Sequence, residues 1–73
     1  MQFNFHPSDF RLLEMRKEKK LSQTEVAKAL GIIQQQYARY EGGANEIPLR
    51  YFIALAQFYG VSLDYLAGLT DER

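Results

Sequence analysis

The segment that most constrains this chain is residues 23–42, QTEVAKALGIIQQQYARYEG, because it holds the residues that two closely crossing short helices require. Ala27 stands where the first helix would meet the second, and a larger side chain there would push the two axes apart. Gly31 suits the turn between them, since the left-handed backbone region costs glycine little and most other residues ~1 kcal/mol or more. The segment therefore predicts a helix, a tight turn and a second helix.

The two predicted helices would each have a buried and an exposed side. The inward positions of the pair are apolar: Val26, Leu30, Ile32, Tyr37 and Tyr40. The outward positions of the second helix are long and polar: Gln34, Gln35, Gln36 and Arg39. A helix that presents glutamine and arginine outward is suited to reading polar groups on a partner; a solvated helix face is the alternative.

Length and composition bound the size and class of the protein. Seventy-three residues make one small domain, residues 1–73, whose stability must come from apolar burial because the sequence lacks cysteine for disulfides or thiolate zinc sites. No apolar run approaches the ~20 residues that span a bilayer, and MQFNFHPSDF at the start lacks the basic and apolar regions of a signal peptide. The sequence therefore predicts a cytoplasmic protein without a membrane partner.

The formal net charge is zero, which argues against an indiscriminate nucleic-acid binder. The charges are unevenly distributed, however. Residues 11–20 hold five basic and two acidic residues, whereas residues 41–73 hold five acidic and two basic ones. We therefore expect one end of the domain to be positive and the other negative.

Local signals predict further helices before and after the central pair. Ser8 and Asp9 are expected to cap a first helix that runs to about Lys19. Ser22 followed by Glu25 is a capping box, which predicts that the second helix covers residues 23–30. The third helix should begin near Ile33 or Gln34 and end at Gly42 and Gly43, with Gly43 in the left-handed position.

The remaining sequence predicts two more helices and no sheet. Pro48 suits the first turn of a fourth helix that runs to about Tyr59 and is stopped by Gly60. Its expected buried residues are Phe52, Ile53, Leu55, Ala56 and Tyr59. Ser62 caps a short fifth helix that Gly68 closes. The one exception is residues 2–6, within a short arm of residues 1–7, which alternate as a half-buried strand would. The predicted fold class is therefore a compact, all-α domain of five helices.

The order and spacing of these motifs resemble the lambdoid phage repressor and Cro superfamily, also called the XRE-type helix-turn-helix family. The resemblance covers residues 11–68, through RLLEMRKEKKLSQTEVAKALGI, QQQYARYEGG, a proline-led helix and GVSLDYLAG. It implies a lambda-repressor-like fold and a DNA-binding transcriptional regulator, usually dimeric. The second and third helices would form the motif, residues 23–42, and the third would lie in the major groove.

The resemblance also implies roles for individual residues. By resemblance, the expected base-reading residues are Gln34, Gln35 and Arg39, and Gln23 is expected to contact a backbone phosphate. From the residues themselves, Ile33 is a further base contact through a thymine methyl, and Gln36, Lys28 and Arg50 are further phosphate contacts; Arg50 is unfavourable toward the dipole of the fourth helix unless an anion binds it. Arg16 and Glu41 match a buried ion pair that ties the first helix to the third. The chemistry is suitable, since glutamine can pair bidentately with adenine and arginine with guanine, each for ~1 to 3 kcal/mol of discrimination.

The sequence departs from the family pattern at several positions. Ile33 replaces the usual Ser or Thr, so the third helix loses a side-chain cap worth ~1 kcal/mol. Lys20 replaces a common glycine, which predicts a strained turn, and Tyr37 brings a phenol that needs a partner. Residues 44–47 contain no Lys or Arg, although relatives often bind phosphate there.

Relatives dimerise near the fifth helix, so Phe58, Tyr65 and Leu69 are either core residues or dimer contacts. We interpret the chain as a sequence-specific, double-stranded-DNA-binding regulator, a repressor that acts as a homodimer on a pseudo-palindromic operator. With one histidine and no cysteine, it offers no catalytic constellation and no metal or cofactor site. The alternatives are an antitoxin-like module whose acidic end binds a protein such as a toxin, or a DNA-binding domain cut from a longer repressor.

Overall fold

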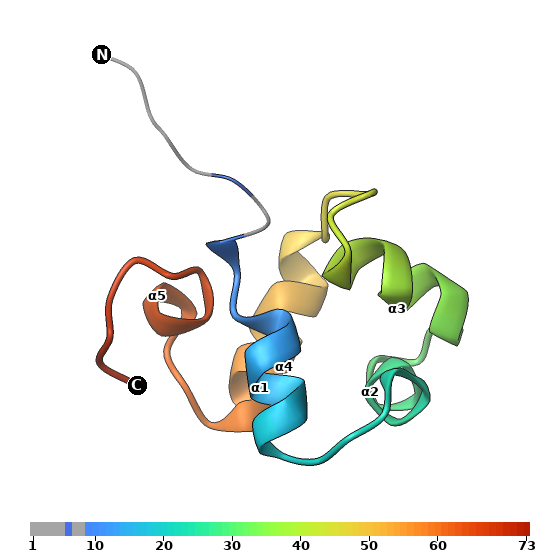
Figure 1. The fold of residues 1–73 in the computed structure, drawn as a ribbon, viewed down its shortest axis with the longest axis horizontal. Coiled ribbons are helices and arrows are strands. Elements are labelled where there is room, and N and C mark those ends of the chain that lie inside the picture. Colours follow the sequence, from blue (N-terminus) through green and yellow to red (C-terminus); the bar gives the residue numbers. More distant parts are fainter. Residues whose placement is uncertain (1–5, 7–8) are drawn as a thin grey trace.

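The computed structural model describes His6 and residues 9–73, and these residues form five α-helices (Figure 1). The helices are α1 (Leu12–Glu18), α2 (Gln23–Leu30), α3 (Gln34–Glu41), α4 (Leu49–Tyr59) and α5 (Leu63–Leu66). In Figure 1, α1 and α4 lie in the middle, with α2 and α3 on one side and α5 on the other. The expected all-helical class is confirmed. None of the described helices is long and apolar enough to cross a membrane.

The hydrophobic core draws side chains from every helix. Its members are Leu12, Met15, Val26, Ala27, Tyr37, Tyr40, Ile47, Phe52, Leu55, Ala56, Tyr59, Tyr65 and Leu66. Leu30 and Ile32 are partly buried and pack against it. Ala27 in α2 is 1% exposed, and α2 packs against α3. Each well-buried leucine, tyrosine or phenylalanine removes enough apolar surface from water to contribute ~1.5 to 3 kcal/mol.

The helix-turn-helix unit begins and turns at the residues that the sequence indicates. The Ser22 hydroxyl accepts a hydrogen bond from the Glu25 N–H at 3.0 Å, and the Glu25 carboxylate accepts one from the Ser22 N–H at 3.0 Å. Gly31 ends α2 in the left-handed region, with φ 74°. The capping box, the turn glycine and the bounds of α2 are therefore confirmed.

The later helices also end close to their predicted positions. Gly43 is left-handed with φ 81°, whereas Gly42 is not. Gly60 ends α4 with φ 70°, and the Ser62 hydroxyl caps α5 by accepting from the Tyr65 N–H at 3.0 Å. Pro48 precedes α4 as its N-terminal flanking residue, one position before the predicted first turn.

The predicted start of α1 is wrong. Asp9 lies in a turn outside the helix, where its carboxylate accepts a hydrogen bond from the His6 N–H at 3.3 Å. The helix begins at Leu12 without a side-chain cap, because the Arg11 N–H donates to the Leu66 carbonyl of α5 at 2.8 Å. A tertiary contact, which leaves no local signal, therefore sets this boundary. Ser8 and the strand predicted for residues 2–6, apart from His6, lie outside the described residues.

Two further predictions concern single residues, Ile53 and Lys20. The burial predicted for Ile53 is wrong: it is 37% exposed, because the buried stripe of α4 runs through Phe52 and Ala56 and leaves Ile53 at its edge. Lys20 adopts φ 58°, the one positive φ outside glycine among the described residues. The strained turn predicted at Lys20 is thus confirmed.

Residues 69–73, the C-terminal segment, fold back against α1 and the start of α5. Asp71 accepts a hydrogen bond from the Arg11 guanidinium at 2.8 Å, and Arg73 donates to Glu18 at 2.6 Å. The Ser62 N–H donates to the Arg73 carbonyl at 2.7 Å. Charges from the basic and acidic parts of the sequence therefore meet, and the expected separation of a positive from a negative end is wrong for these residues.

Candidate nucleic-acid interface

The first residues of α2 and α3 are joined by their side chains. The Gln34 amide nitrogen donates a hydrogen bond to the Gln23 side-chain oxygen at 2.7 Å. The Gln23 amide nitrogen in turn donates to a Glu41 carboxylate oxygen at 3.3 Å. Gln23 therefore links an expected base-reading residue to the acidic end of α3, and it is half-buried rather than free on the surface.

Arg16 and Glu41 form the predicted ion pair. The guanidinium donates through Nε and Nη2 to the two carboxylate oxygens, both at 2.9 Å, and its Nη1 donates to the Leu21 carbonyl at 2.9 Å. The side chains of Arg16 and Glu41 are 15% and 6% exposed, so the pair ties α1 to α3 within the protein. Burial raises the pKa of Glu41, but hydrogen bonds from Arg16 and Gln23 outweigh it and hold that pKa below its ordinary value.

Two phenols are buried beside this pair. The hydroxyls of Tyr37 and Tyr59 have no hydrogen-bond partner among the described residues. The partner expected for Tyr37 is thus absent at hydrogen-bond distance, although its hydroxyl lies near Glu41. Burial raises the pKa of Tyr59 to about 12 and also raises that of Tyr37. Both phenols therefore stay neutral around pH 7 and serve as packing groups.

The outer surface of α3 carries the residues expected to read bases. Gln35 and Arg39 are exposed, and Gln34 is half-buried next to Gln23. Ile33 precedes the helix in extended backbone, with 65% of its surface exposed and no side-chain cap. The absence of a cap at this position agrees with the sequence prediction. Ile33, Gln35 and Arg39 thus offer an apolar group, an amide and a guanidinium to a partner.

The four residues expected to contact phosphate have different surroundings. Gln36 donates to the Tyr40 hydroxyl at 2.9 Å. Arg50 lies over the Tyr51 ring, with Cζ 4.6 Å from the ring centroid. Lys28 is exposed and makes no ion pair within the described part of the chain. Gln23, the fourth, is held by Gln34 and Glu41.

The residues expected at a dimer contact do not share one surface. Tyr65 is 7% exposed, with the Arg11 and Arg73 guanidinium carbons 4.1 Å and 5.2 Å from its ring centroid, so of the two expectations for Tyr65 the structure supports a core residue. Phe58 is 50% exposed and packs its ring against Tyr59 on α4. Leu69 is 71% exposed and lies elsewhere, at the rim of an apolar groove.

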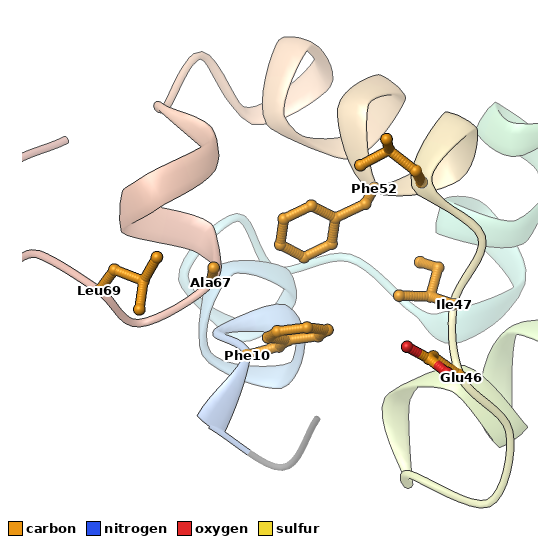
Figure 2. Close-up of a pocket in the computed structure, with 7 residues that line it drawn as sticks. Phe10, Glu46, Ile47, Phe52, Ala67 and Leu69 are labelled. Carbon is orange, nitrogen blue, oxygen red and sulfur yellow. The ribbon is translucent and has the colours of Figure 1, made fainter. Parts of the chain in front are cut away.

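That groove has a volume of about 520 Å³ and opens between the ends of α1, α4 and α5 (Figure 2). Its lining residues are Phe10, Glu46, Ile47, Leu49, Phe52, Ala67 and Leu69. The Phe10 and Phe52 rings approach with centroids 4.8 Å apart, and Leu49 at the start of α4 is 67% exposed. The groove therefore joins two exposed leucines, Leu49 and Leu69, across a pair of packed aromatic rings.

Comparisons with known proteins identify the family of this chain. A family model described as helix-turn-helix matches residues 12–66. The HTH-type transcriptional regulator YobD of Bacillus subtilis is 40% identical over 62 residues, which is 85% of this chain and 55% of YobD. The cryptic phage CTXphi transcriptional repressor RstR of Vibrio cholerae is 36% identical over 63 residues, 86% of this chain and 57% of RstR.

A crystal structure of a transcriptional regulator from Listeria innocua superposes with a TM-score of 0.81 and 26% identity, covering 96% of this chain and 65% of that one. The chain spans about half the length of the curated relatives that it matches. The family match covers most of the chain, and it agrees with the five helices, the capped α2 and the left-handed glycine between α2 and α3. The chain belongs to the XRE-type, phage-repressor-like helix-turn-helix family of DNA-binding transcriptional regulators.

Proposed function

We propose that this protein binds double-stranded DNA sequence-specifically through α3 and represses transcription as a homodimer on a pseudo-palindromic operator. The observation that carries this proposal is the outer surface of α3, where Gln35 and Arg39 are exposed and Gln34 is held by Gln23. The name of RstR as a transcriptional repressor supports repression. Dimeric binding rests on the symmetry of helix-turn-helix operators.

The hydrogen-bonding capacity of Gln34 suits base reading. Its amide nitrogen gives one proton to Gln23, which leaves the second amide proton and the carbonyl oxygen. One donor and one acceptor are what the major-groove edge of adenine requires. Gln23 therefore holds the Gln34 amide in one orientation without using the groups that would contact adenine.

Arg39 supplies the complementary chemistry. Its guanidinium is exposed on the last turn of α3 and can pair bidentately with the O6 and N7 atoms of guanine. Ile33, exposed at the other end of the helix, can contact a thymine methyl. An operator half-site with an adenine, a guanine and a thymine in its contacted positions is thus the expected target.

The groove lined by Leu49 and Leu69 is our candidate for the dimer contact, with a second copy of this chain as its occupant. Two exposed leucines beside a cavity of about 520 Å³ form an apolar surface that a symmetric copy can cover. Two-fold symmetry would then place the two α3 helices about one DNA turn, ~34 Å, apart. Leu69→Glu should weaken dimerisation on DNA, as sedimentation measures.

Selection of binding sites from random duplex DNA, followed by affinity measurements, tests the reading function. Gln35→Ala should cost ~1 to 3 kcal/mol on the selected operator and relax the preference at one base pair per half-site, because one amide pair is lost. The matched control is Gln57→Ala, which removes an exposed glutamine from α4 and should leave the preference unchanged.

An unchanged ratio between operator and random-duplex affinity in both Gln34→Ala and Gln35→Ala would contradict base reading. That result would favour the antitoxin-like alternative, in which the protein acts mainly by binding another protein such as a toxin. Co-purification of such a partner would then identify the function.

A further inference from the structure

A series of hydrogen bonds leads from the inside of the protein to the start of α3. Arg16 donates to both carboxylate oxygens of Glu41 at 2.9 Å. From the other side, the Gln23 amide nitrogen donates to Glu41 Oε1 at 3.3 Å, and the Gln34 amide nitrogen donates to the Gln23 oxygen at 2.7 Å. Every bond in the series is donated toward Glu41, so the carboxylate is the group on which the others depend.

The carboxylate decides how both glutamine amides are turned. The paired guanidinium keeps Glu41 ionised, and an ionised carboxylate can only accept hydrogen bonds. Gln23 must therefore turn its nitrogen toward Glu41 and its oxygen away from it. That oxygen can also only accept, so Gln34 must turn its own nitrogen toward Gln23. Glu41 thus fixes the orientation of an amide that it does not touch.

The orientation of the Gln34 amide matters because adenine and guanine differ in the same respect. At the major-groove edge, adenine offers one acceptor and one donor, whereas guanine offers two acceptors. With its nitrogen toward Gln23, Gln34 keeps one N–H and its oxygen, which match adenine. If the amide were turned around, its oxygen would face Gln23 and its two N–H groups would match guanine. The two orientations have nearly the same shape, so packing alone does not choose between them.

We propose that Glu41 is a specificity-determining positioning residue, which acts through Gln23 on the Gln34 amide and so selects adenine over guanine at one base pair in each operator half-site. The Glu41 side chain is 6% exposed, so it acts from inside the protein and contacts no base. The proposal rests on the proposed function, because it needs α3 to read bases.

Stability alone does not account for an ion pair at this place. Apolar side chains of similar volume can often replace a buried ion pair without loss of stability. They cannot replace the acceptor that Glu41 offers to Gln23. The reading role therefore depends on the acceptor itself, which makes it separable from packing by substitution.

The first test replaces the pair in the full chain by Arg16→Met together with Glu41→Leu. Loss of preference in Gln34→Ala identifies the base pair, and duplexes that differ only by A·T or G·C there give the ratio of the two affinities. The wild type should prefer adenine. The double variant should lose about 5- to 100-fold of that ratio, the value of one bidentate pair, while random-duplex affinity stays about the same. Glu18→Gln, which breaks the exposed ion pair with Arg73, is the matched control and should keep the ratio.

The second test changes Gln23 and leaves the ion pair intact, so it decides the question even if the double variant does not fold. Gln23→Lys places a group that only donates between Glu41 and Gln34. The Gln34 oxygen must then turn toward it, and the preference should move from adenine to guanine. Gln23→Glu, added to the double variant, supplies an acceptor again and should restore the preference for adenine. Overall affinity changes in these variants, because Gln23 is an expected phosphate contact, but the ratio of two matched duplexes is insensitive to that change.

The outcomes separate the possible failures. The assignment is overturned if the base read by Gln34 is guanine in the wild type. It is also overturned if Gln34→Ala alters the preference while the double variant and Gln23→Lys both keep the wild-type ratio; the proposed function then stands. If only Gln35→Ala alters the preference, Gln34 is not a reader, and the role of Glu41 fails alone. If neither glutamine variant alters it, the proposed function itself fails.

Discussion

The two sides of α1 hold the same kind of ion pair in different surroundings. Towards α3, Arg16 pairs with Glu41, and their side chains are 15% and 6% exposed. Each partner makes one more hydrogen bond, Arg16 to the Leu21 carbonyl and Glu41 from the Gln23 amide. Towards the C-terminal segment, Arg73 meets Glu18 with side chains that are 50% and 40% exposed. Removing one partner leaves an uncompensated charge inside the protein in the first case, and a solvated charge in the second. We therefore expect the surroundings of an ion pair to decide how much it contributes to stability.

The largest effect is expected from Glu41→Ala. It would leave the mostly buried Arg16 guanidinium without its carboxylate, and we expect the free energy of unfolding to fall by ~3 to 5 kcal/mol. Urea denaturation measures this loss. Glu18→Ala is the matched control and should move the midpoint much less, so equal shifts in the two variants would contradict the comparison.

The second prediction uses the pKa of Glu41, which is lowered in the folded protein. A carboxyl of this kind stabilises the fold above its unfolded pKa, ~4.3, and the contribution is lost as the pH falls through the lower folded value. Wild type and Glu41→Gln should therefore differ most in unfolding free energy at neutral pH and converge in acid. A difference that stays constant from pH 7 to low pH would show that the Glu41 charge contributes nothing.

The third prediction compares the starts of α2 and α3. Ser22 and Ile33 have nearly the same backbone, with φ −84° and ψ 162° against φ −82° and ψ 156°, but only Ser22 supplies a cap. A hydroxyl at residue 33 needs no backbone change, so Ile33→Thr should stabilise the protein by ~1 kcal/mol. The control is Ile33→Val, which has the shape of threonine without the oxygen. Equal urea midpoints for the two variants would rule out a capping gain.

The sequence predicted the features that depend on local chemistry. The capping box at Ser22, the left-handed Gly31 and Gly43, the helix stop at Gly60 and the cap at Ser62 each act within a few residues, so their patterns are visible in the chain. The ion pair of Arg16 and Glu41 followed from the family resemblance. The glutamines predicted for the outer side of the third helix do lie in α3, where Gln35 is exposed and Gln34 and Gln36 are half-buried.

The features that the sequence did not predict all join distant residues. The start of α1 depends on the carbonyl of Leu66, and Tyr65 is covered by Arg11 and Arg73. The bond between Gln23 and Gln34, which orients a proposed base-reading residue, exists only because α2 and α3 start side by side. No periodicity or spacing encodes such contacts, since they follow from how the helices pack.

The smallest expected effect is that of Glu18→Gln in the exposed ion pair of Arg73 and Glu18. This substitution removes the charge and keeps the shape of the side chain. Arg73 would retain its position over Tyr65 and the hydrogen bond from Ser62 to its carbonyl, so the C-terminal segment keeps other contacts. We expect a slight fall in the urea midpoint at low ionic strength that vanishes near ~1 M salt, where the Debye length is only about 3 Å. Glu41→Ala should keep most of its effect at both salt concentrations, because its partner is shielded from ions. An effect of Glu18→Gln that persisted undiminished at high salt would show that the two pairs are alike after all.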